Sequence, residues 1–323
     1  HCGDEAFLRP SMGSWVSYGL GTESDNLPGF ITICPTTLHG GVNNFGAAFL
    51  PSSHQGVPLG APGYPNTLAK DAKFNYMTND SLSPRQQKLQ LELLRKLHER
   101  NQSNSTINEA LEARIQSFEL AFRMQMSVPE LIDSKSEPKS VLEMYGPQAT
   151  LPGKYAYNCL LARRLAERGV RFIQLYHRGW DAHGTAPKGV AAQCRDTDQP
   201  TAALLRDLKQ RGMLNDTLVI WGGEFGRTIY CQGKLTRQNY GRDHHPNCFT
   251  YWLAGGGIRK GITYGETDDY SVNVAENPVH VHDLQATIMH QLGIDHERLT
   301  YRYQGRYFRL TDVHGKVVKD ILS

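Results

Sequence analysis

Two stretches of the sequence share one pattern, in which an amphipathic helix is followed by a glycine and a short apolar strand. The first predicted helix carries apolar residues at helical spacing, namely Tyr157, Leu161 and Leu165. Gly169 then ends the helix, and residues 170–176, most of them apolar, predict a buried strand.

The second stretch repeats this order. Pro200 is expected to open a helix with Leu204, Leu205 and Leu208 on one side, Gly212 closes it, and residues 217–221 predict another buried strand. Two consecutive helix-to-strand units favour an α/β protein with a mainly parallel sheet and helices on both of its faces.

A helical hairpin is predicted over residues 83–127, inserted into this α/β domain. Ser83 and Pro84 supply a start signal, and Thr106 with Glu109 forms a capping-box pattern for the second helix. The apolar residues that recur along the two helices are Leu89, Leu93 and Leu97, then Leu111, Ile115, Phe118 and Phe122. The hairpin is interpreted as a packing or interface element without chemistry.

The remaining elements are predicted more coarsely. Residues 1–78 are rich in Gly, Pro, Asn and Ser and predict long loops, with a short strand at 30–34. A strand is expected over 248–253, a helix over 283–292, and an edge hairpin from Tyr301 onward.

Length and charge exclude some classes of function. The 323 residues suffice for one large or two smaller domains, and the formal net charge is only +3. Without a long basic run, nucleic acid is not expected as a partner. The apolar runs are far shorter than the roughly 20 residues of a membrane-spanning helix.

The chain begins at His1, not Met, and is expected to be a fragment of a longer protein.

Polar side chains follow both predicted strands at their carboxyl ends. Asp181 and His183 come after the strand at 170–176, and Glu224 and Arg227 come after the strand at 217–221. In open α/β sheets this edge is where ligands bind. Carboxylate and imidazole are suitable ligands for zinc or manganese. The alternatives are an Asx-turn at Asp181 and a Glu224–Arg227 ion pair that only fixes the loop.

The strongest single signal is the run Asp243, His244 and His245 before the strand at 248–253. We expect at least one of the three to bind a metal, with Asp243 either a ligand or a hydrogen-bond partner of a ligating imidazole. His280 and His282 are weaker candidates, because Asp283 beside them is explained by helix capping. Ser11 and Ser14 have no evident base nearby in sequence.

These motifs resemble the domain-of-unknown-function family 1501, a bacterial branch of the alkaline phosphatase and sulfatase superfamily. The matching stretches are RPSMGSWVSYGLGTESDNLPGF at 9–30, GWDAHG at 179–184, GGEFGRT at 222–228, GRDHHPNCFTYWLAGGGIRKG at 241–261 and ENPVHVHDLQATIMHQLGIDHERLTYRYQGR at 276–306. The resemblance covers nearly the whole chain. It implies an alkaline-phosphatase-like three-layer sandwich, N-terminally incomplete, and a periplasmic or secreted location.

The resemblance also implies a two-metal hydrolase of phosphate or sulfate esters. Asp181 and His183 would hold one metal, Glu224 would stand where relatives carry an Asp-His pair, and His244 or His245 would be the later histidine ligand. The ion would be zinc or manganese, with calcium as a weaker option, and Arg227 would anchor a small anionic ester. Phe225 departs from the pattern, since relatives place a ligand His there, and the nucleophile segment would precede His1.

Two other functions stay open at this point. The chain could be a metal-binding or surface protein that keeps the fold without turnover, because a fold alone does not fix function. A phosphomutase-like transferase on the same scaffold is the weaker alternative.

Overall fold

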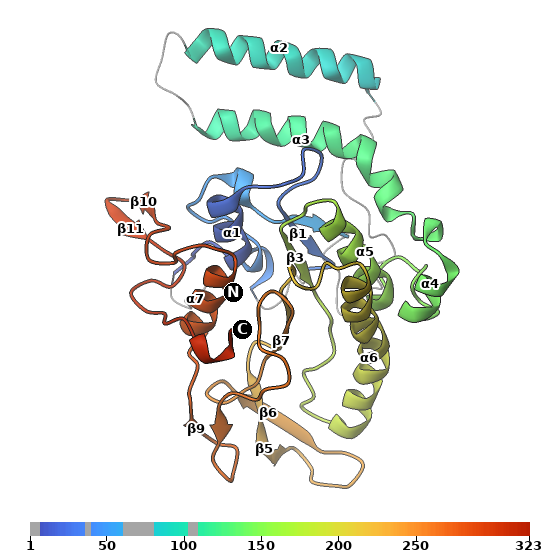
Figure 1. Cartoon of the computed structure of the whole chain (residues 1–323), viewed down its shortest axis with the longest axis vertical. Coiled ribbons are helices and arrows are strands. Elements are labelled where there is room, and N and C mark those ends of the chain that lie inside the picture. The colour runs from blue at the N-terminus through green and yellow to red at the C-terminus, as the bar shows by residue number, and fades with distance from the viewer. Residues whose placement is uncertain (1–6, 36–39, 61–80, 103–108) are drawn as a thin grey trace. The chain divides into compact units, whose positions relative to one another are not determined.

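The computed structural model describes residues 7–35, 40–60, 81–102 and 109–323, and it has a mixed α/β architecture (Figure 1). The chain divides into two compact units. The first comprises residues up to 138, 148–176 and 300–310, and the second comprises 139–147, 177–299 and 311–323. The predicted α/β class is confirmed.

A three-stranded parallel sheet forms the centre of the first unit. Its strands are β1 (Phe30–Ile33), β2 (Val57–Leu59) and β3 (Phe172–Leu175), in the order β2-β1-β3. The register pairs Phe30 with Phe172 and Ile33 with Leu175. Every residue of β1 is buried, as expected for the middle strand of a parallel sheet with both faces covered.

Two helices pack against this sheet, α1 (Met12–Leu20) and α5 (Tyr155–Glu167). Gly13 lets α1 approach closely, because a Cβ there would collide with the rings of Phe30 and Phe172. The predicted apolar face of α5 is confirmed, since Leu161 and Leu165 are buried in the main core cluster. The prediction of loops over residues 1–78 was wrong at α1.

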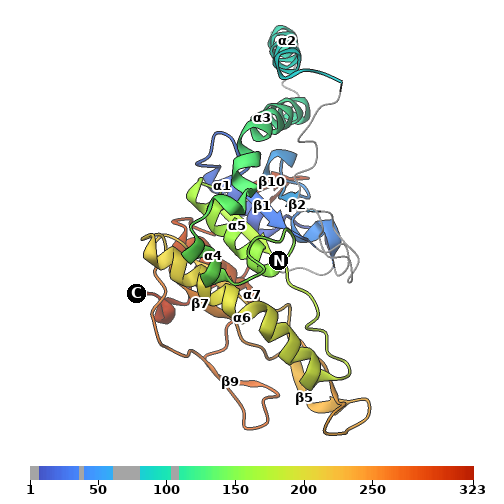
Figure 2. The same ribbon diagram turned by 90° about the vertical axis from the view of Figure 1, so that its right-hand side faces the viewer.

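The helical hairpin is present as α2 (Pro84–Gln102) and α3 (Glu109–Ile132). The two helices lie side by side at one end of the first unit in both views (Figures 1 and 2). The expected cap at Thr106 lies outside the described residues. Ile115 is buried, but Leu89, Leu93, Leu97, Leu111 and Phe118 are exposed, so most of the predicted apolar stripe is not core.

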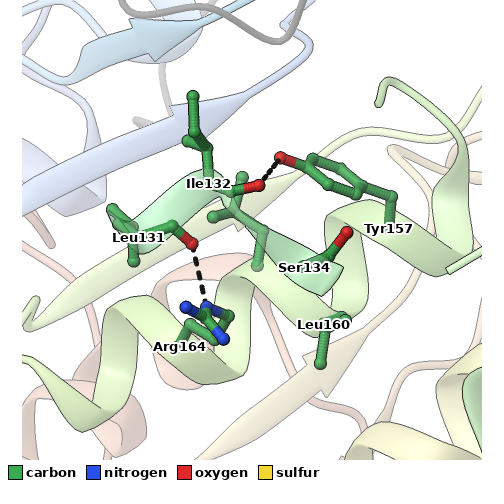
Figure 3. Close-up of a pocket in the computed structure, with 7 residues that line it drawn as sticks. Leu131, Ile132, Ser134, Tyr157, Leu160 and Arg164 are labelled. Atoms are coloured by element: carbon green, nitrogen blue, oxygen red, sulfur yellow. Dashed lines mark hydrogen bonds between the residues drawn. The ribbon is translucent and has the colours of Figure 1, made fainter. Parts of the chain in front are cut away.

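The carboxyl end of α3 is held by side chains from α5 (Figure 3). The last carbonyl groups of a helix lack partners within the helix. Here the Tyr157 hydroxyl donates to the Ile132 carbonyl at 2.8 Å, and Arg164 Nε donates to the Leu131 carbonyl at 2.8 Å. Arg164 Nη2 also donates to the Glu130 carbonyl at 2.8 Å, which ties the hairpin to the core.

The second unit contains the long helix α6 (Ala186–Gln210) and strands β4 (Val219–Trp221) and β7 (Trp252–Ala254). Strands β4 and β7 pair antiparallel, so β4 does not continue the parallel sheet that contains β3. The expectation of a mainly parallel sheet was therefore wrong beyond β1, β2 and β3. The prediction that Pro200 opens a helix was also wrong, because Pro200 lies inside α6 and not at its start.

The second unit is completed by α4 (Lys139–Tyr145), two hairpin-like pairs and α7. The pairs are β5 (Gly226–Gln232) with β6 (Gly241–His245) and β8 (Glu266–Thr267) with β9 (Val274–Glu276). Helix α7 (Val281–Gln291) begins with His280 as N-cap in a capping box with Asp283, which confirms the capping role of Asp283.

The predicted edge hairpin is also confirmed. It consists of β10 (Tyr301–Tyr303) and β11 (Arg306–Phe308) in the first unit. Within the residues that the structure describes, no helix combines the length and apolarity needed to cross a membrane.

Candidate metal centre

Three side chains from the predicted set converge in the second unit: Asp181, His183 and His244. Asp181 Oδ1 lies 2.9 Å from His183 Nε2 and 3.1 Å from His244 Nε2. The two imidazole Nε2 atoms lie 3.1 Å apart. One carboxylate oxygen and two ring nitrogens thus form a nearly equilateral triangle, and among the described residues this is the only group of its kind.

The backbone explains why residues 61 positions apart in sequence meet here. Arg242 N donates to the Ala182 carbonyl at 3.0 Å, which joins β6 to the loop that carries Asp181 and His183. Gly241 permits this approach, because a Cβ at that position would collide with the His183 carbonyl.

Strand β6 separates the three consecutive candidates Asp243, His244 and His245. Successive side chains of a strand point to opposite faces, so His244 faces Asp181 while its two neighbours do not. Asp243 Oδ1 accepts a hydrogen bond from the backbone N–H of His244 at 2.8 Å. His245 Nε2 lies 2.7 Å from the carbonyl oxygen of Val272. Neither side chain belongs to the triangle.

Arg227 lies beside the triangle and contacts its carboxylate. β5 and β6 pair Arg227 with His244, and Arg227 Nη2 donates to Asp181 Oδ1 at 2.7 Å. Burial alone would raise the pKa of Asp181, but the hydrogen bonds from Arg227 and His244 and the nearby positive charge outweigh it and lower that pKa. Arg227 Nη1 is buried and has no hydrogen-bond partner among the described residues.

Glu224 does not belong to the group of Asp181, His183 and His244. It is exposed and lies near Tyr251, whose pKa is raised by burial and by the Glu224 charge. The Tyr251 hydroxyl donates to the Gly223 carbonyl at 2.6 Å. The alternative of a Glu224–Arg227 ion pair is not what the structure shows, because Arg227 pairs with Asp181.

Two further side chains complete the surroundings, and only one of them, Phe225, is singled out by the sequence. Gln232 Oε1 lies 2.5 Å from His183 Nδ1, and the Phe225 ring packs against His244 with centroids 4.4 Å apart. If His183 is protonated on Nδ1, this N–H donates a hydrogen bond to Gln232. The lone pair of Nε2 then faces Asp181 and His244. No sequence pattern marks Gln232, since its role depends on where β5 lies.

The Gln232→Ala substitution is expected to weaken zinc binding by about 10–100-fold, because it removes the acceptor that orients the His183 ring. Competition against a chromophoric chelator measures the change. Gln232→Glu is the matched control, since it keeps an oxygen acceptor and should retain affinity. Equal affinity of the alanine variant and the original protein would contradict this role.

The carboxylate oxygen and the two imidazole nitrogens suit a metal ion that is intermediate between hard and soft. Zinc lies about 2.0–2.2 Å from such donors, so tetrahedral ligands are separated by about 3.3–3.6 Å. The edges of 2.9, 3.1 and 3.1 Å reach that spacing with shifts of a few tenths of an ångström. Manganese accepts the same carboxylate and imidazole donors. Calcium fits less well, because it takes 6–8 oxygen ligands and two of these donors are nitrogens.

The other candidates have structural roles in helix capping and hydrogen bonding and are not members of the triangle. His280 caps α7, and His282 is buried with its Nδ1 2.9 Å from Gln285 Oε1. Ser11 caps α1, and the Ser14 hydroxyl donates to the Gly46 carbonyl at 3.0 Å. Both serines belong to the first unit.

Comparison with known proteins gives one match. No curated protein and no solved structure is similar enough to count as a match. The model of a family described as "Protein of unknown function (DUF1501)" matches residues 1–322. Because this match covers nearly all of the chain, the protein belongs to the DUF1501 family.

Proposed function

We propose that the protein is a metal-dependent hydrolase of phosphate or sulfate esters on an alkaline-phosphatase-like fold. The observation that carries the proposal is the meeting of a three-donor group with an arginine that has a buried, unpartnered nitrogen. A buried unsatisfied donor calls for a ligand or solvent partner, and a guanidinium favours the oxygens of phosphate-like anions.

Each residue has a distinct role in this proposal. Asp181, His183 and His244 hold the ion, which when bound polarises an ester oxygen as a Lewis acid. Arg227 fixes Asp181 through Nη2 and places a guanidinium charge beside the ion, where it would attract an anionic ester. Gln232 orients His183, and Phe225 restricts the His244 ring from its other side. The exposure of the three donors leaves the group open to a ligand from solvent.

A second function, metal binding without turnover, is favoured by one observation. Among the described residues, the side chains that hydrogen-bond to or stack on the side chains of Asp181, His183 and His244 are Arg227, Gln232 and Phe225, apart from these three themselves. None of these carries a hydroxyl, so the contacts of the group supply no serine or threonine nucleophile.

The test uses the protein expressed from the start codon of its native gene. Bound zinc and manganese are quantified, and p-nitrophenyl sulfate and p-nitrophenyl phosphate are assayed with and without a chelator. We expect stoichiometric metal and chelator-sensitive turnover of at least one ester. Arg227→Met should keep the metal but lower turnover by about 10²–10³-fold, since it removes a charge-stabilising donor.

The outcomes separate the two functions. Stoichiometric metal without turnover of either ester would reject the hydrolase and leave the metal-binding function. Protein that binds neither metal would reject both. Asp181→Asn should lose metal and turnover together, and turnover that survives this substitution would show that the triangle is not the active centre.

A further inference from the structure

The loop that carries Asp181 and His183 contains a hydrogen bond between two further side chains. The indole Nε1 of Trp180 donates to Nδ1 of His177 at 2.9 Å. An indole N–H can only donate, so Nδ1 of His177 must present a lone pair. The proton of the neutral imidazole then lies on Nε2, and the contact with Trp180 thereby fixes the tautomer of His177.

The other nitrogen of His177 faces helix α6. Its Nε2 lies 3.5 Å from Oδ2 of Asp196, a residue in the middle of that helix. At this distance the carboxylate attracts the N–H but makes only a weak hydrogen bond. Burial is the largest influence on the pKa of His177 and lowers it, although Asp196 acts in the opposite direction. The imidazole is therefore neutral at neutral pH, as its acceptor role toward Trp180 requires.

A glycine brings the same loop close to α6. Gly179 has a φ of 94°, in the left-handed region that favours glycine. A Cβ at this position would lie 2.5 Å from Nε2 of Gln193. Because Gln193 and Asp196 are three residues apart in α6, they lie on the same face of the helix. The loop therefore contacts one face of α6 at both His177 and Gly179.

The backbone links the position of Trp180 to the metal ligands. The Ala182 N–H donates to the Trp180 carbonyl at 2.9 Å, and the His183 N–H donates to the Asp181 carbonyl at 3.1 Å. Each of these bonds closes a three-residue turn, and Asp181 is the central residue of the first turn. Because such a turn restricts its central residue, a displacement of Trp180 would reorient Asp181.

Ring packing alone does not fix the orientation of Trp180. Its ring meets the ring of Trp221 edge to face, with centroids 5.8 Å apart, and Trp221 is itself 37% exposed. Apolar contacts are non-directional, so this contact stabilises the indole without setting its rotation. The hydrogen bond to His177 is directional and supplies that restriction.

We infer that His177 is a positioning residue of the metal centre, which accepts the Trp180 N–H, holds the loop of residues 177–183 against α6 and thereby sets the place of Asp181. His177 acts through Trp180 and not through a contact of its own with the ion. The inference rests on the metal centre of the proposed function, and it applies equally to a hydrolase and to a protein that binds metal without turnover.

Crystal structures of the metal-free protein and of two variants test the positioning directly. His177→Phe keeps a ring but cannot accept the Trp180 N–H, whereas His177→Asn places an oxygen acceptor near the position of Nδ1. In His177→Phe, we expect the distance from Asp181 Oδ1 to His244 Nε2 to grow from 3.1 Å to beyond the roughly 3.6 Å that two zinc ligands allow. His177→Asn should keep the original distance.

Zinc affinity, measured by competition with a chromophoric chelator, gives a second readout. His177→Phe and Trp180→Phe should each weaken binding by about 10-fold, the lower end of the range for residues that support metal ligands. The double variant should lose no more than either single variant, because both substitutions remove the same hydrogen bond. His177→Asn should retain the affinity. His290→Phe is the control, since it removes an exposed histidine of α7 and should leave zinc binding unchanged.

Three results would overturn the inference: an unchanged triangle in His177→Phe, additive losses of affinity in the double variant, or a loss in His177→Asn as large as in His177→Phe. If the original protein binds no zinc, the proposed function fails, but the crystal structures still decide the role of His177. If His177→Phe does not fold, Trp180→Phe takes its place in the crystals, because it removes the same hydrogen bond and keeps an aromatic ring.

Discussion

Replacing Glu137 with glutamine is expected to destabilise the first unit by about 3–5 kcal/mol, because it removes the anion between two buried arginines. Glu137 Oε2 lies 2.6 Å from Arg163 Nη2, and its other oxygen contacts Arg164. The side chains of Glu137, Arg163 and Arg164 are 6%, 2% and 7% exposed, so water cannot replace the lost charge. Urea unfolding followed by circular dichroism measures the change in unfolding free energy.

The same carboxyl makes the stability depend on pH. Burial alone would raise the pKa of Glu137, but its hydrogen bonds and charge interactions with Arg163 and Arg164 outweigh burial and lower that pKa. A lowered folded pKa stabilises the folded chain above the unfolded value of about 4.3, and this contribution is lost as pH falls through the folded pKa. The difference between the original protein and Glu137→Gln should therefore be full at neutral pH and shrink only in acid.

Glu130→Gln is the matched control. Glu130 pairs with Arg168 at 3.0 Å in the same unit, but its side chain is 80% exposed. Its loss should change the unfolding free energy by less than about 1 kcal/mol, as for other surface ion pairs. If the two variants unfold alike, the buried cluster of Glu137, Arg163 and Arg164 does not stabilise the first unit.

The His244→Ala substitution is expected to weaken zinc binding by more than about 100-fold, since even outer-shell partners of metal ligands contribute about 10–100-fold. His245→Ala should leave the affinity unchanged. The two histidines are adjacent in β6, yet only His244 faces Asp181, while His245 lies against the Val272 carbonyl. Competition with a chromophoric chelator compares the two variants under the same conditions.

This pair of variants tests the geometry and not merely the presence of histidine. Equal losses would mean that β6 does not separate the two rings in solution. A loss confined to His245→Ala would place the metal on the opposite face of β6. In either case, unchanged circular dichroism spectra show that the substitutions did not unfold the second unit.

The secondary structure was predictable where the apolar pattern is regular. Helix α5 and strand β3 were both expected, because Leu161 and Leu165 repeat at helical spacing and a segment rich in apolar residues follows Gly169. Helix α1 was missed. Its sequence contains two glycines and lacks a clear repeat, and it is stabilised instead by the Ser11 cap and by burial of Trp15 and Val16.

The hairpin of α2 and α3 illustrates a second limit of prediction from the sequence. Its two helices were expected from capping signals and leucine spacing, but the spacing alone does not say which face is buried. His98 and Ile115 face the helix contact, while Leu93, Leu97 and Phe118 remain on the outside. Helical periodicity identifies an amphipathic helix, whereas the partner that covers each face is a property of the assembled structure.

The residue types that could form a metal centre are evident from the sequence, which offers Asp181, His183 and His244 among six candidates. The fold brings these three together, turns Asp243 and His245 away, and places Gln232 beside His183. The difference lies in the distance along the chain over which each interaction acts. Helix and strand periodicity and capping are local, so they can be read from neighbouring residues. Strand partner, direction and register are fixed by hydrogen bonds between distant segments, and a shift of one residue in β6 would exchange His244 for His245.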